Sequence, residues 1–152
     1  MSDLAIRPAR ADDVAAIAGL HAEDAVGGHG DVWSDETRPA YEAAFARIAA
    51  SPDIALFVAE KEGAVVGAFQ VCAIPGIAGR GSTRVKVEGV QVRRDLRSAG
   101  IGAAMMAAAE AWAQERGAAF LELTSNATRT DAHRFYARLG YKQSHLGFKK
   151  KL

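Results

Sequence analysis

A glycine-rich turn with the sequence RSAGIG, residues 97–102, has the spacing that most directly suggests a chemical role. It lies between an apolar segment that ends near Arg93 and a helical pattern that begins at Ile101. Free N–H groups at the start of a helix point outward, and the helix dipole adds about half a positive charge there. Gly100 and Gly102 would let a phosphate come close to the backbone. The turn is predicted to bind a phosphate group, and a plain strand-to-helix turn remains the alternative.

Two nucleotide-binding motifs with similar glycines do not fit this turn. A Walker loop needs Lys and Ser or Thr after its glycines, but Gly102 is followed by Ala103 and Ala104. A dinucleotide fingerprint needs a third glycine where Met105 stands. With 19 basic and 18 acidic residues the net charge is only +1, so no general attraction for nucleic acid or for a membrane surface is expected. Any anion site must be local.

Glu88 and Tyr136 are the two candidates for proton transfer. Glu88 stands on a valine-rich segment, where a carboxylate is not expected to be buried without a partner. It is either a proton acceptor or an exposed carboxylate that faces Arg84 or Lys86. Tyr136 lies on the apolar face of a helical pattern, so it is either a proton donor or a packed core residue. A tyrosine with a pKa of about 10 is protonated at neutral pH and can donate a proton.

The strand that precedes the turn, at 83–93, changes its pattern half-way. Val85 and Val87 occupy odd positions, whereas Val90 and Val92 occupy even ones. A regular strand cannot bury both pairs on one face. Gly89 lies where the pattern changes, so a β-bulge is predicted there, a device that often redirects a strand beside a functional site.

The remaining elements follow from periodicity and turn signals. Further strands are predicted at 4–8, 54–60, 65–74 and 119–124, with one or two more in 141–152. Helices are predicted from Asp12, after Ser34, from Ile101 and from Asp131. The apolar stripe of the first helix includes the position of His21. Gly63 marks a hairpin turn, and the glycine-rich stretch 25–33 is predicted to be a mobile loop. This order places a crossover helix between parallel strands of an otherwise antiparallel sheet.

Composition indicates one globular domain spanning residues 1–152. Hydrophobic residues make up 49% of the chain and charged residues 24%, with no stretch suited to a membrane span. The single cysteine, Cys72, cannot form an internal disulfide, and the first residues lack the pattern of a secretory signal, so a cytoplasmic location is expected. The four histidines have no ligand-like spacing, so no metal site is expected.

Several motifs in order resemble the GNAT superfamily of N-acetyltransferases. They are the pattern [Q/R]-x-x-G-x-[G/A] at 97–102, the VEGVQV strand before it, and Asn126 followed by Phe135, Tyr136, Gly140 and Tyr141. The resemblance covers essentially the whole chain. Segment 122–145, which contains DAHRFY, is similar more specifically to aminoalkylphosphonate N-acetyltransferases.

The resemblance implies a single-domain mixed α/β fold with a splayed, mostly antiparallel sheet flanked by about four helices. It implies acetyl-CoA as cosubstrate, with Tyr136 as the acid that protonates the leaving thiolate and Glu88 as a base that acts through a water. The residues implied to bind acetyl-CoA are Val90, Gln91 and Val92 through their backbone, the turn residues Arg97, Ser98, Ala99, Gly100, Ile101 and Gly102, and Asn126 and Arg129.

The implied reaction is acetyl transfer to the primary amine of a small molecule, by direct attack in a ternary complex. Two alternatives remain open: acetylation of a protein lysine or N-terminus, and a CoA-binding sensor without catalysis. Dimers are frequent in the superfamily, so a homodimer is expected.

Overall fold

The structure, a computed structural model, describes residues 3–24 and 28–152. Residues 25–27 of the predicted mobile loop lie outside the described residues. The chain divides into two compact units, Met1–Glu122 and Leu123–Leu152.

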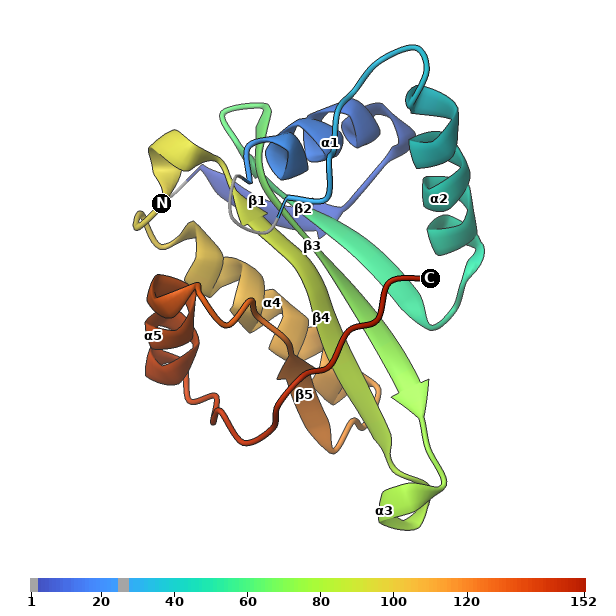
Figure 1. The fold of residues 1–152 in the computed structure, drawn as a ribbon, viewed down its shortest axis with the longest axis vertical. Coiled ribbons are helices and arrows are strands. Elements are labelled where there is room, and N and C mark those ends of the chain that lie inside the picture. Colours follow the sequence, from blue (N-terminus) through green and yellow to red (C-terminus); the bar gives the residue numbers. More distant parts are fainter. Residues whose placement is uncertain (1–2, 25–27) are drawn as a thin grey trace. The chain divides into compact units, whose positions relative to one another are not determined.

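A five-stranded sheet in the order β1-β2-β3-β4-β5 runs through the first unit (Figure 1). Its strands are β1 (Leu4–Pro8), β2 (Ile54–Lys61), β3 (Ala64–Pro75), β4 (Thr83–Val92) and β5 (Phe120–Leu123). From β1 to β4, each strand pairs antiparallel with the next one along the chain. The N–H of Ala119 donates to the carbonyl of Thr83 at 2.8 Å, so β4 and β5 begin side by side and run parallel. The mixed, mostly antiparallel fold predicted from sequence is confirmed.

Helices cover both faces of this sheet. On one face lie α1 (Val14–Ala22), which follows a short 3-10 helix at Ala11–Asp13, and α2 (Arg38–Ala50) (Figure 1). Ile17 and Leu20 of α1 pack against Val58 and Ala68. On the other face α4 (Ile101–Glu115) contacts β3 and β4 and buries Met105 completely. Single turns, α3 (Ala78–Gly81) and a 3-10 helix at Arg94–Leu96, flank β4.

The predicted bulge at Gly89 is confirmed by the register of β3 and β4. Gln70 lies opposite Glu88 and Ala68 opposite Gln91, so three steps along β4 match two along β3. Gly89 adopts φ 61°, a backbone conformation that favours glycine. After the bulge, Gln91 lies opposite Ala68, which packs against α1, and Val92 lies opposite Gly67, which faces Met105 of α4.

Two other local predictions differ in outcome. The hairpin turn is confirmed: Glu62 and Gly63 both have positive φ, 51° and 77°, as a two-residue turn between twisted strands requires. The helix predicted after Ser34 is present as α2, but it buries none of its residues fully. None of the helices in the described residues is long and apolar enough to cross a membrane.

The second unit contains α5 (Thr130–Arg138) and a C-terminal tail. The helix ends at Gly140, with φ 93°, and the N–H of Tyr141 donates back to the Tyr136 carbonyl at 3.1 Å. The prediction of one or two strands in 141–152 is wrong, because these residues have no regular structure. A strand needs a neighbour to pair its backbone groups, and Leu146 and Phe148 of this tail are exposed.

Candidate active site

The glycine turn presents backbone donors at the start of α4. Gly100 is the residue before the helix and adopts φ 84° and ψ 0°, in the left-handed region. The first helical hydrogen bond of the turn runs from the N–H of Ala104 to the Gly100 carbonyl at 3.2 Å. The N–H groups of Ile101, Gly102 and Ala103 precede it and have no acceptor within the helix. No acidic side chain stands in the first turn of α4 to compete with an anion.

Arg97 ties this turn to the end of β4. Its Nε donates to the Val92 carbonyl at 3.2 Å, and the side chain remains exposed. Ser98 beside it has φ 65°, and residues 98–100 are all exposed. Several outward N–H groups, one arginine and no competing carboxylate fit the diphosphate of CoA.

The second half of β4 has a backbone edge that β5 does not reach. Strand β5 has only four residues against ten in β4, and the two begin side by side at the Ala119–Thr83 hydrogen bond. Residues 90–92, at the end of β4, therefore lie beyond the end of β5. Backbone groups on this edge can pair with an extended ligand as another strand would.

Glu88 lies just before the bulge and forms an ion pair. Its Oε1 is 3.3 Å from Nζ of Lys86, and the Glu88 side chain is 52% exposed. Of the two partners that the sequence left open, Lys86 is the one observed, because Arg84 pairs with Glu122 at 2.9 Å. An exposed pair of this kind contributes little to stability, and the carboxylate stays accessible to water.

The end of α1 meets β4 at the bulge, and sequence reasoning missed this junction. A Cβ added to Gly89 would lie 3.2 Å from Cε1 of His21. Gln91 is buried, and its Nε2 donates to Oδ2 of Asp24 at 2.9 Å. The only signal in the sequence was a histidine at an apolar-stripe position of the first helix, which reads equally as a core residue.

Tyr136 belongs to the second unit, where it is half-buried on α5. Its ring makes edge contacts with Phe135 and Tyr141, with centroids at 5.1 Å and 5.8 Å. Burial raises the pKa of Tyr136 above its ordinary value of 10.0, and the nearby charge of Arg129 opposes this. The hydroxyl is therefore fully protonated at neutral pH.

Asn126 shapes the loop before α5. Its Oδ1 accepts hydrogen bonds from the N–H and the hydroxyl of Thr128, at 3.0 Å and 2.8 Å. This is an Asx turn, which uses the Asn126 side chain locally. Arg129 is half-buried at the start of α5.

The structure thus gathers most of the predicted site on one strand, one turn and one helix start. Glu88, residues 90–92 and residues 97–102 all belong to the first unit. Tyr136, Asn126 and Arg129 belong to the second. Within the residues that the structure describes, no three His, Cys, Asp or Glu side chains are grouped to hold a metal ion.

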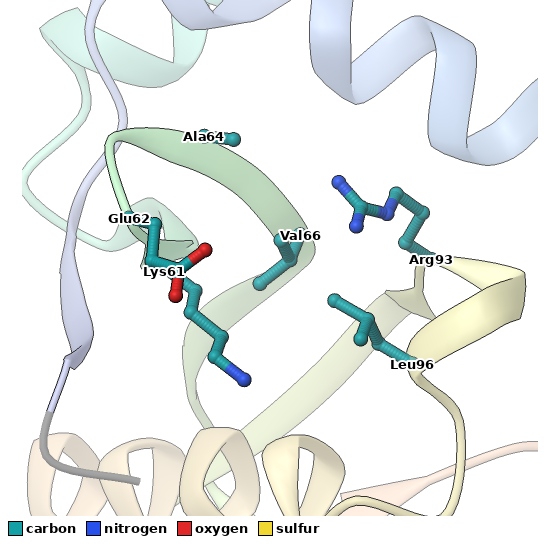
Figure 2. A pocket seen from close by; sticks show the side chains of 6 residues that line it. All are labelled: Lys61, Glu62, Ala64, Val66, Arg93 and Leu96. Carbon is teal, nitrogen blue, oxygen red and sulfur yellow. The ribbon is translucent and has the colours of Figure 1, made fainter.

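A separate half-open pocket lies where the β2–β3 hairpin meets the end of β4 (Figure 2). Its lining is partly charged and consists of Lys61, Glu62, Ala64, Val66, Arg93 and Leu96. The Arg93 guanidinium is paired with Asp95 at 2.7 Å. No residue predicted to bind acetyl-CoA or to transfer a proton lines this pocket.

The sequence matches the acetyltransferase (GNAT) family over residues 14–141, a range that includes both halves of the predicted site. The chain belongs to this family. The resemblance inferred from the turn and the strand before it is confirmed, and so is the enzyme class, an acetyl-CoA-dependent N-acetyltransferase.

Individual relatives agree with this membership. An aminoalkylphosphonate N-acetyltransferase from Salmonella typhimurium is 45% identical over 67 residues, which span 44% of this chain and 44% of that protein. A crystal structure described as a transcriptional regulator from Bacillus halodurans C-125 is 33% identical, has a TM-score of 0.94, and the match covers 98% of this chain and 99% of that one.

A third solved structure has the same fold. The aminoglycoside N-acetyltransferase AAC(6')-Iy, solved in complex with CoA, superimposes with a TM-score of 0.79. It is 19% identical, and the match covers 97% of this chain and 94% of that one. This likeness shows the shared fold.

Proposed function

We propose that this protein transfers the acetyl group of acetyl-CoA to the primary amine of a small molecule, by direct attack in a ternary complex. The observation that carries the proposal is that the β4 bulge and the glycine turn follow each other closely in the chain. Together they offer an open strand edge for an extended thioester arm and a set of N–H donors for its diphosphate. Residues 1–152 would act as one N-acetyltransferase domain, since the family match crosses from the first unit into the second.

In this proposal the turn residues 97–102 bind the diphosphate and the backbone of 90–92 binds the pantetheine arm. Asn126 and Arg129 contribute from the second unit. One N–H of the bulge region holds the carbonyl oxygen as negative charge develops on it. Glu88 acts as the base through a water, and the Tyr136 hydroxyl protonates the departing thiolate.

A small acceptor is favoured by the relatives. The matched Salmonella typhimurium protein is named for aminoalkylphosphonates, and AAC(6')-Iy for aminoglycosides. Both names describe small amines. We extend to this chain only what the names share, a primary amine on a small polar molecule, in a cytoplasmic enzyme that acts as a homodimer.

A second candidate function is a CoA-binding sensor without catalysis. The relative described as a transcriptional regulator favours it, because it is similar over almost the whole of both chains. Such a protein would still bind CoA but would transfer nothing.

A thiol-release screen separates the candidates. The protein is mixed with acetyl-CoA and with amino acids, polyamines, aminoalkylphosphonates or lysine-containing peptides, and free CoA is measured over time. The proposal expects release that depends on a small amine. Release with peptides alone would favour a protein acetyltransferase, and acetyl-CoA binding without release would favour the sensor.

A further inference from the structure

His21 of α1 lies directly against the bulge of β4. A Cβ built on Gly89 would be 3.2 Å from Cε1 and 3.5 Å from Nε2 of its imidazole. Only glycine leaves the bulge backbone open to this ring without crowding it. The imidazole edge therefore faces the part of β4 to which the proposed function assigns the reacting thioester.

Hydrogen bonds from β4 and the segment after it fix the end of α1 in this position. The buried Gln91 amide donates to Asp24 at 2.9 Å. Beyond the strand, the N–H of Arg94 donates to the Glu23 carboxylate at 3.2 Å, and its guanidinium donates to the Glu23 carbonyl at 2.8 Å. These hydrogen bonds to Glu23 and Asp24, which follow closely after His21 in the chain, hold His21 at the bulge.

The ring is packed but still accessible. His21 is half-buried, and its ring nitrogens form no hydrogen bond within residues 3–24 and 28–152. Over the same residues, no fully buried side-chain nitrogen or oxygen lacks a partner. The ring nitrogens of His21 are thus left available for a hydrogen bond with a water.

Burial keeps the imidazole of His21 neutral at physiological pH, against the pull of two nearby carboxylates. Burial lowers the pKa of His21 below its ordinary value of 6.5, and His29 lowers it further. Asp31 and Asp24 act in the opposite direction. On β4 the nearest carboxylate, Glu88, is paired with Lys86 at 3.3 Å. From α2, the Tyr41 hydroxyl donates to Asp31 at 2.7 Å.

We propose that Nε2 of His21 is the final acceptor of the proton that the substrate ammonium group loses before attack. This rests on the proposed function and adds a residue to it. One proton passes from the ammonium group through the water near Glu88 to Nε2, and later to solvent. The neutral amine then forms the C–N bond as the C–S bond breaks. The Tyr136 hydroxyl protonates the departing thiolate, and the second proton from the nitrogen restores that hydroxyl, so the products are the amide, CoA thiol and one proton.

The test compares His21→Gln with the wild-type protein across pH, using the best acceptor from the screen. Ala15→Gln, which places the same side chain at an exposed position of the same helix, is the matched control. A lost general base lowers kcat/KM by about 100-fold near neutral pH. The loss should shrink toward pH values near 10, where about half of a primary amine is already neutral. Calorimetry should give an unchanged acetyl-CoA affinity.

Imidazole rescue provides a second readout if glutamine disturbs the helix. In His21→Ala, added imidazole should restore acetyl transfer in proportion to its neutral form. A wild-type rate in His21→Gln, or an equal loss at every pH without rescue, would overturn this proposal and leave the proposed function standing. If the wild-type protein releases no thiol with any amine, the proposed function fails and the role of His21 fails with it.

Discussion

Tyr136 carries a hydroxyl that burial among aromatic rings keeps protonated beyond the ordinary range of tyrosine. A proton donor for a thiolate needs this property, because the conjugate acid of a thiolate has a pKa of only about 8.5. The sequence could not separate this role from plain packing, because an apolar helix face is common to both. The edge contacts show that the ring is packed.

Tyr136→Phe removes the hydroxyl and keeps the ring contacts. We expect kcat to fall by about 100-fold, with acetyl-CoA affinity unchanged by calorimetry. Tyr141→Phe is the matched control, since it removes the hydroxyl of the ring that faces Tyr136 at 5.8 Å. An unchanged kcat in Tyr136→Phe would remove this residue from the mechanism.

Glu88→Gln removes the carboxylate beside the bulge and leaves Lys86 without its partner. We expect kcat/KM to fall most at low pH, where few acceptor amines are neutral and proton removal limits attack. Glu122→Gln removes a similarly exposed, paired carboxylate on β5 and should have no such profile. An equal effect across pH would argue against a role in proton removal.

Among the elements, β4 was the most predictable because its valines report the bulge directly. A change of phase within one strand has few physical solutions, and a glycine at the change indicates one of them. The tail at 141–152 was the least predictable. Its apolar residues suggested strands, but a strand also depends on a pairing partner, which a single segment does not reveal.

The junction of β1 and α1 depends on a buried ion pair. Arg7 donates to both Asp13 oxygens, at 2.8 Å and 3.0 Å, and the Asp13 side chain is only 9% exposed. The Arg7 hydrogen bonds hold the pKa of Asp13 below its ordinary value of 3.8. Since the folded-state pKa is the lower one, this stabilisation is fully present above the unfolded pKa and is lost as pH falls through the folded one.

Asp13→Asn should therefore lower the free energy of unfolding by about 2 kcal/mol at neutral pH, measured by denaturant titration. The difference from the wild-type protein should shrink below about pH 4. Asp12→Asn, at the exposed neighbouring position, is the control and should change stability by less than about 0.5 kcal/mol. A difference that stays constant into acid would mean that the charge of Asp13 is not what matters.

For the whole molecule, fold and reaction class were accessible from sequence because each depends on ordered local motifs. The crossover from β4 through α4 to β5 follows from periodicity, and the cosubstrate from the resemblance of the turn and its neighbouring motifs to the GNAT superfamily. The acceptor was not accessible, because substrate choice depends on side chains that come together only in the fold. His21 shows this: its neighbour Gly89 is far away in sequence, and no spacing rule connects the two.

The central claim is that the turn at 97–102 binds acetyl-CoA, and calorimetric titration of the whole chain tests it most directly. We expect the wild-type protein to bind acetyl-CoA. Gly102→Val should weaken binding by about 100-fold or more, because the added side chain crowds the N–H groups at the start of α4. Ala107→Val, at an exposed position of the same helix, should bind as the wild-type protein does. A folded Gly102→Val protein with wild-type affinity for acetyl-CoA would contradict the account.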